Sequence, residues 1–192
     1  MTGFDVGNVI DAAWIAFGLY WLAAALRLNR MKKREPSHER LLRFVLMATA
    51  FLLLYRDSGP NFGPLNRRFI PYASWIETVG AALTCLGVAF AIWARSHIGR
   101  YWSSTVSIRA DHQLIRTGPY AHIRHPIYTG ILLALGGTVV VIGRYRAIVA
   151  LAILLIAFTW KARREEALLS TEFGPAFDEH KRLTGFFLPR IS

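Results

Sequence analysis

The feature that most constrains this chain is the sorting of its apolar residues into long blocks, with the charged residues gathered between them. Hydrophobic residues fill 54% of the 192 positions, more than the roughly 45–50% of an ordinary soluble domain. A helix of about 20 apolar residues crosses a bilayer core of about 30 Å. We therefore predict an all-α, polytopic integral membrane protein that forms a single membrane domain over residues 1–192.

Five apolar blocks are candidate transmembrane helices. They cover residues 8–28, 41–55, 72–95, 127–143 and 147–161. The first three would make an N-terminal half, residues 1–95. The last two should form a tight helical hairpin, because only a short basic turn separates them. The second and fifth blocks are short, and the fifth could instead be a re-entrant or partly buried helix.

The net charge of +11 would suit either nucleic acid or anionic lipid head groups. Because Lys and Arg flank the apolar blocks, we expect membrane lipid and no nucleic acid as partner. If all five blocks cross, 18 of these residues lie on the side of the C-terminus and 5 on the other. The more basic side is normally cytoplasmic, which predicts an outside N-terminus, with loop 96–125 and the C-terminus cytoplasmic. The first block lacks a preceding basic region and is expected to remain as a helix.

A metal site is not expected. Cys85 is the only cysteine, which excludes a cysteine-based zinc site. His122 and His125 are three residues apart, with His112 nearby, but Pro126 argues against one continuous helix through them.

The segment that precedes the fourth block is rich in polar and aromatic residues. Pro126 suits the first turn of a helix, which places His125 at the helix entrance. The free N–H groups there favour an anion, although a simple helix start explains the same pattern. Tyr120 and Tyr128 could stack on an adenine or face a sulfonium, or could belong to the aromatic belt of the membrane interface.

A charged segment follows the fifth block. Lys161 and Glu165 are four residues apart and share a helix face. The cation could hold an anionic substrate while the carboxylate holds the ammonium or ribose hydroxyls of a cofactor. The alternative is a basic helix end that continues into a solvated, charged helix.

Taken together, the motifs resemble the isoprenylcysteine carboxyl methyltransferase family and its phospholipid methyltransferase relatives. The resemblance covers residues 97–190. It rests on the ordered set Gly118-Pro-Tyr120, four residues, His125-Pro-x-Tyr-x-Gly130, a hydrophobic hairpin, Glu165-Glu166-x-x-Leu169, Phe173-Gly174 and Pro189.

The resemblance implies S-adenosylmethionine as cofactor, with Glu165 closing its site. The other implied cofactor-binding residues are His112, Gln113, Leu114, Ile115, Gly118, Tyr120, His125, Pro126, Ile127 and Tyr128. Where eukaryotic members place an arginine for the substrate carboxylate, this chain has Lys161, with Arg163 and Arg164 nearby. Lysine lacks the planar fork that grips a carboxylate. Lys161, Arg164 and Arg124 are the candidate catalytic residues.

The function predicted in this way is methyl transfer to a lipophilic or lipidated acceptor. A carboxylate acceptor of the isoprenylcysteine type needs no metal and no general base, whereas an amine would first have to lose a proton. A phospholipid amine N-methyltransferase is therefore an alternative. An NADPH-dependent sterol-type reductase is another, because that superfamily has a similar Arg-His-Pro-x-Tyr-x-Gly segment. Asp11 and Glu77 leave room for a non-enzymatic membrane protein or transporter. The acceptor and the oligomeric state remain open.

Overall fold

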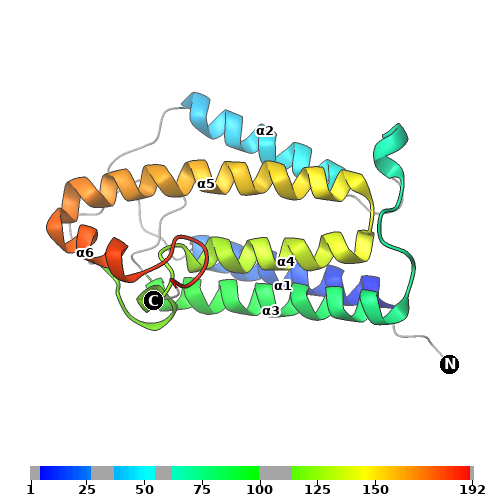
Figure 1. The fold of residues 1–192 in the computed structure, drawn as a ribbon, viewed down its shortest axis with the longest axis horizontal. Coiled ribbons are helices and arrows are strands. Elements are labelled where there is room, and N and C mark those ends of the chain that lie inside the picture. Colours follow the sequence, from blue (N-terminus) through cyan, green and yellow to red (C-terminus); the bar gives the residue numbers. More distant parts are fainter. Residues whose placement is uncertain (1–4, 27–36, 55–61, 100–113, 191–192) are drawn as a thin grey trace.

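The computed structural model describes residues 5–26, 37–54, 62–99 and 114–190 (Figure 1). Within these ranges the regular structure is helical, apart from two isolated β-bridges, Arg68 with Arg144 and Ile123 with Gly185. The α-helices are α1 (Val6–Leu26), α2 (Ser37–Leu54), α3 (Ser74–Ile98), α4 (Pro126–Ile142), α5 (Tyr145–Phe173) and α6 (Pro175–Leu183), and the 3-10 turns are η1 (Gly63–Asn66) and η3 (Gly118–Ala121). The predicted all-α class is confirmed for this part of the chain.

Among the described residues, three helices are long and apolar enough to cross a membrane, over Val6–Ala24, Ser74–Ile98 and Tyr145–Phe173. Phe44–Leu54 and Pro126–Ile142 are shorter apolar helices, so five full-length spans are not established. The prediction that the fifth block is short was wrong. Helix α5 has 29 residues and continues through the charged segment, where Lys161 Nζ lies 3.6 Å from Glu165 Oε1 one turn further along. The helix ends at Gly174, whose φ of 50° is left-handed.

Small residues let α3 and α4 pack closely. A Cβ on Gly87 would lie 2.6 Å from the carbonyl oxygen of Gly130, and one on Gly137 would lie 2.6 Å from the amide nitrogen of Thr84. The buried Thr84 hydroxyl donates to the carbonyl of Ala134 at 3.2 Å. Close backbone approach at small residues is the usual basis of helix association in lipid. The interface therefore fixes the position at which α4 begins.

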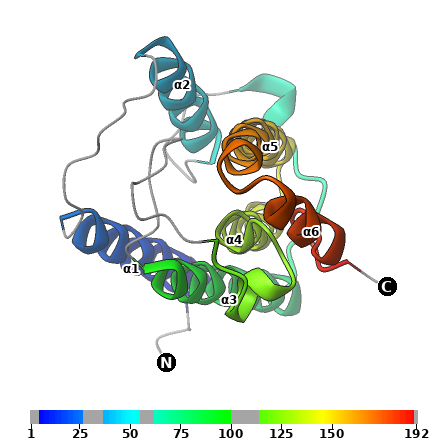
Figure 2. The same ribbon diagram turned by 90° about the vertical axis from the view of Figure 1, so that its left-hand side faces the viewer.

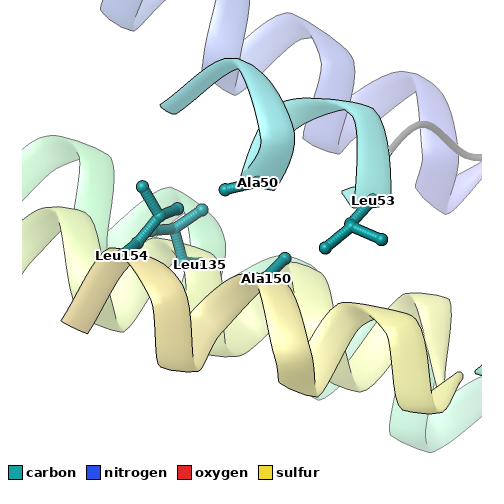
Figure 3. Packing of buried hydrophobic residues seen from close by; sticks show 5 residues of the cluster. All are labelled: Ala50, Leu53, Leu135, Ala150 and Leu154. Carbon is teal, nitrogen blue, oxygen red and sulfur yellow. The ribbon is translucent and has the colours of Figure 1, made fainter. Parts of the chain in front are cut away.

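The other helices surround this pair. Viewed along the bundle, α1 lies beside α3, α5 beside α4, and α2 beside α5 (Figure 2). Buried apolar side chains of α2, α4 and α5 form one core cluster (Figure 3). They are Ala50, Leu53, Leu135, Ala150 and Leu154. Large apolar side chains such as Phe51, Trp75 and Ile156 point outward and are exposed, as expected of a surface that faces lipid.

The predicted hairpin of the last two apolar blocks is confirmed. Gly143, with φ 61°, and Arg144 link α4 to α5. Arg68 donates from Nη1 to the carbonyl of Ile142 at 2.9 Å, and Arg146 donates to the carbonyl of Leu53. These arginines thus cap the C-terminal ends of α4 and α2, where cations are favoured.

Candidate active site

Three segments that are far apart in the sequence meet at one end of the bundle. They are the first turn of α4, the last turns of α5 and the chain that follows α6, near the C-terminus in Figure 1. Pro126 is the first residue of α4, as predicted, and His125 is its N-cap residue. We call the polar side chains that gather here the α4-start cluster, which comprises Arg124, His125, Tyr128, Lys161, Glu165 and Glu166.

Hydrogen bonds join the start of α4 to the acidic pair of α5. Arg124 Nε donates to Glu166 Oε1 at 2.5 Å, and Tyr128 donates its hydroxyl to Glu165 Oε1 at 2.8 Å. His125 Nε2 lies 3.2 Å from the same Glu166 oxygen. The start of α4 and the acidic pair of α5 therefore lie against each other. Glu166 was not predicted as a site residue.

Glu165 stands between a cation and an imidazole. Lys161 Nζ is 3.6 Å from its Oε1, and His125 Nδ1 is 3.8 Å from its Oε2, too far for a hydrogen bond. Lys161 also lies over the Tyr128 ring, 5.4 Å from the ring centroid, within range of a cation–π attraction. The side chain of Glu165 is 24% exposed. It therefore has room to accept a further N–H or O–H donor.

The segment after α6 pairs with the backbone that leads into α4. The amides of Arg124 and His125 donate to the carbonyls of Gly185 at 2.9 Å and Phe186 at 3.2 Å. Gly185 N donates back to the carbonyl of His122 at 3.0 Å. Sequence reasoning missed this pairing, because a single β-bridge between distant segments has no periodic pattern that would reveal it.

Aromatic side chains line the same region. The Tyr128 ring stacks on Phe158, with centroids 5.2 Å apart, and the edge of Phe186 faces His125 at 4.9 Å. Phe158 and Phe186 were not predicted as site residues. Phe158 could have been found from its position on α5, three residues before Lys161 and on the same side of the helix.

Several of the predicted cofactor residues pack beside the cluster instead of inside it. Tyr120 is buried, and its hydroxyl donates to the carbonyl of Ala94 at 3.4 Å. Burial, together with the nearby Glu165 carboxylate, raises the pKa of the Tyr120 hydroxyl. Tyr120 and Ile127 share a hydrophobic cluster against which Ile115 packs, so they support the start of α4 from the α3 side.

The remaining predicted residues are more dispersed. Leu114 is half-buried and Pro126 is buried, and Gly118 holds a left-handed φ of 59° beside the His97 ring. Arg164 is exposed, with its guanidinium carbon 5.6 Å from the Trp160 ring centroid. His112 and Gln113 lie outside the described residues.

No group of three or more His, Cys, Asp or Glu side chains in the described ranges could hold a metal ion. What the cluster offers instead is a partly exposed carboxylate, a cation and aromatic faces. That combination can accept hydrogen bonds from an ammonium or hydroxyl group and can face a positively charged sulfur.

Comparisons with known proteins find similarity to one methyltransferase family and to bacterial metal-resistance proteins. The model of the isoprenylcysteine carboxyl methyltransferase (ICMT) family matches residues 80–171. The nickel-cobalt-cadmium resistance protein NccN of Alcaligenes xylosoxydans xylosoxydans is 34% identical over 128 residues, which cover 63% of this chain and 57% of that protein. The protein-S-isoprenylcysteine O-methyltransferase of Schizosaccharomyces pombe is 27% identical over 118 residues, which cover 60% of this chain and 50% of that protein. The chain thus spans about half the length of these relatives.

The fold has a counterpart among solved structures. The structure of the eukaryotic intramembrane Ras methyltransferase ICMT superposes with a TM-score of 0.52 at 22% sequence identity, over 82% of this chain and 55% of that one. In the part of the chain that the structure describes, three helices are long and apolar enough to span a bilayer, which makes this chain an integral membrane protein. Over residues 80–171 the chain is similar in sequence to the isoprenylcysteine carboxyl methyltransferase family, and its fold is similar to that of a solved member.

Proposed function

We propose that this protein is a membrane methyltransferase that uses S-adenosylmethionine to methylate a lipophilic acceptor. The observation that carries the proposal is the contact of Arg124, His125 and Tyr128 with the acidic pair Glu165 and Glu166. These residues all lie in the segment that the family model matches. The match to the family model favours methyl transfer over the sterol-type reductase and over a non-enzymatic membrane protein.

The residues present suit the cofactor. When bound, S-adenosylmethionine supplies a methyl group on a positively charged sulfur, which becomes a neutral thioether as the methyl carbon bonds to the acceptor. Glu165, which is partly exposed, would accept hydrogen bonds from the cofactor ammonium or ribose hydroxyls. The first turn of α4, where the His125 side chain makes no capping hydrogen bond, would favour the cofactor carboxylate. The Tyr128 face would favour the sulfonium.

A carboxylate is the acceptor that the cluster favours. A carboxylate is already anionic at neutral pH, so the protein has only to align it and balance its charge. Lys161, whose side chain is 13% exposed, is the cation that would do so, with Arg164 as its neighbour on the same helix. Because the S. pombe relative is a protein-S-isoprenylcysteine O-methyltransferase, we propose the carboxylate of an S-prenylated cysteine as the acceptor.

The proposal extends to the topology. We propose that the α4-start cluster and the C-terminus face the cytoplasm, because most Lys and Arg residues flank that end of the bundle. A lipophilic acceptor would then reach Lys161 from the cytoplasmic leaflet.

A binding experiment tests the cofactor. Purified protein in detergent is titrated by calorimetry with S-adenosylmethionine and, separately, with NADPH. We expect the wild type to bind S-adenosylmethionine only, and Glu165→Gln to bind it at least about tenfold more weakly, as expected for the loss of a charge-assisted hydrogen bond. Glu172→Gln, an exposed carboxylate on the same helix, is the control. Binding of NADPH alone would reject the proposal.

A transfer experiment tests the acceptor. Protein in nanodiscs is given isotope-labelled S-adenosylmethionine and either an S-farnesyl cysteine derivative with a free carboxylate or phosphatidylethanolamine vesicles. We expect label in the prenyl cysteine ester, with Lys161→Met raising KM for this acceptor. Label in the phospholipid alone would favour the amine alternative.

A further inference from the structure

The two neighbouring glutamates of the α4-start cluster have different surroundings. The Oε1 atom of Glu166 lies 2.5 Å from Arg124 Nε and 3.2 Å from His125 Nε2. The side chain of Glu166 is 16% exposed. Glu165 accepts one hydroxyl at 2.8 Å and is the more exposed of the two, at 24%. Glu166 is therefore the more buried carboxylate and is held by two side chains at the start of α4, whereas the more exposed Glu165 is better placed to accept a donor from a ligand.

Arg124 connects three elements at once. Its Nε binds Glu166 on α5, and its Nη1 donates to the carbonyls of Lys181, at 3.3 Å, and Thr184. Both carbonyls belong to the C-terminal end of α6, where a cation is favourable. The guanidinium carbon also lies 5.6 Å from the centroid of the Phe186 ring. Because its guanidinium is bound to Glu166 and to two backbone carbonyls, Arg124 is engaged by the protein.

His125 contacts both Glu166 and Phe186. Its Nε2 lies 3.2 Å from Glu166 Oε1, and its ring centroid lies 4.9 Å from that of Phe186. Its amide donates to the Phe186 carbonyl at 3.2 Å. One helical turn further into α4, the Thr129 hydroxyl donates to the carbonyl of Phe187 at 2.6 Å. The chain after α6 is therefore docked along the first turn of α4.

We propose that Arg124 and Glu166 form a latch that docks residues 184–187 onto the start of α4, and that this latch orients His125 and leaves Glu165 as the ligand for the cofactor. Arg124 and Glu166 are then positioning residues, and the catalytic role predicted for Arg124 gives way to this one. The role of Glu165 rests on the proposed function. The docking of the C-terminal segment does not.

Hydrogen–deuterium exchange of the full-length protein in detergent, without ligand, tests the latch. We expect Arg124→Gln and Glu166→Gln each to speed exchange about tenfold in peptides that contain residues 122–125 and 184–187, as expected for the loss of a charge-assisted hydrogen bond. Arg182→Gln on the exposed side of α6 and Glu172→Gln on α5 are the matched controls. Unchanged exchange in both latch variants would overturn the proposal.

Conservative rescue separates positioning from simple loss of folding. Lysine keeps the charge but lacks the fork that reaches several acceptors, so Arg124→Lys should restore part of the protection and remain folded. Peptides from α1 and α3, far from the latch, should exchange as in the wild type in every variant. General acceleration in Arg124→Lys, including α1, would mean that Arg124 supports the whole fold and would overturn a local latch.

Cofactor binding distinguishes the two glutamates. Glu165→Gln should weaken S-adenosylmethionine binding while leaving exchange at residues 184–187 unchanged. Glu166→Gln should weaken binding and speed that exchange together, and Arg124→Lys should recover both in part. Loss of binding in Glu166→Gln without faster exchange would overturn the division of roles. If the wild type bound no S-adenosylmethionine, the proposed function would fail, while the exchange data would still decide whether the latch exists.

Discussion

Gly118 holds the turn before α4 in a conformation that suits glycine. Its φ is 59°, and a Cβ there would lie 2.6 Å from Cε1 of His97, whose Nε2 lies 2.9 Å from the Thr117 hydroxyl. We expect Gly118→Ala to lower the free energy of unfolding by about 1–2 kcal/mol from the backbone alone, with an added cost from the displaced His97 ring. The measurement is the melting temperature in detergent.

Gly63 provides the matched control for this substitution. It has nearly the same φ, 57°, but a Cβ there would meet nothing within 4 Å. Gly63→Ala should therefore show the backbone cost alone. Equal losses in the two variants would mean that the His97 contact has no influence on stability.

The lowered pKa of His180 makes the stability of the protein depend on pH. Burial, then the positive charges of Arg116 and Arg124, lower its pKa, and Glu166 opposes them. Between this lowered pKa and about 6.5, the unfolded chain binds more protons at His180 than the folded protein does. Stability from this residue is therefore present above about pH 6.5 and is lost on acidification.

We expect the melting temperature of the wild type to fall as the pH is lowered from 7 to 5, and His180→Gln to fall less over the same range. His122, an exposed histidine, gives the control variant His122→Gln, which should follow the wild type. Parallel curves for His180→Gln and the wild type would contradict a role for His180 in the acid lability.

At the scale of elements, the contact of α3 with α4 is the most demanding part of the packing. A Cβ on Gly87 would meet backbone atoms of Gly130 and Ala134, which cannot move aside as a flexible side chain can. We expect Gly87→Ala to destabilise the protein by about 1–3 kcal/mol, because the helices must separate. Thermal unfolding followed by intrinsic fluorescence would measure the loss.

Gly136 on α4 is the control, since a Cβ there meets nothing within 4 Å. In a helix interior, glycine costs about 0.5–1 kcal/mol relative to alanine, so Gly136→Ala should be neutral or stabilising. A destabilising Gly136→Ala would show that the interface extends further around α4 than the contacts indicate.

Hydropathy located the helices well, because lipid imposes the same requirement on every span. The predicted blocks 127–143 and 72–95 correspond to α4 and α3 within three residues at each end. The end of α5 was missed by twelve residues, since the charged segment from Lys161 was taken as the end of the helix. Gly174 followed by Pro175 was the true stop signal.

The candidate site was predictable where it depends on local geometry. His125 and Pro126 at a helix start, and Lys161 with Glu165 on one helix face, follow from chain-local rules. The choice of Glu166 as the partner of Arg124 does not, because both glutamates sit on the same turn and only the packing of α4 on α5 decides between them.

At the scale of the whole molecule, the length of α4 and the hydrogen bonds at its C-terminal end indicate how it lies in the membrane. Its 17 residues span about 25 Å, less than a bilayer core of about 30 Å. Nevertheless, Gly143 at its end accepts a hydrogen bond from Phe69 at 2.8 Å, and Tyr145 donates to the Arg67 carbonyl at 3.2 Å. The α4–α5 turn is thus tied to the connection that precedes α3, and the two should lie on one side of the membrane.

Cysteine labelling of intact cells tests this arrangement. Cys85 is the only native cysteine, so single cysteines are introduced into a Cys85→Ala background at Leu65, Tyr145 and Leu188, which are 38%, 47% and 73% exposed. A maleimide that cannot cross membranes should label the first two sites in intact cells, and Leu188→Cys only after the cells are opened. Protection of Tyr145→Cys beside a labelled Leu65→Cys would mean that α4 turns back before the outer surface. Labelling of Leu188→Cys from outside would instead reverse the orientation inferred from the basic residues.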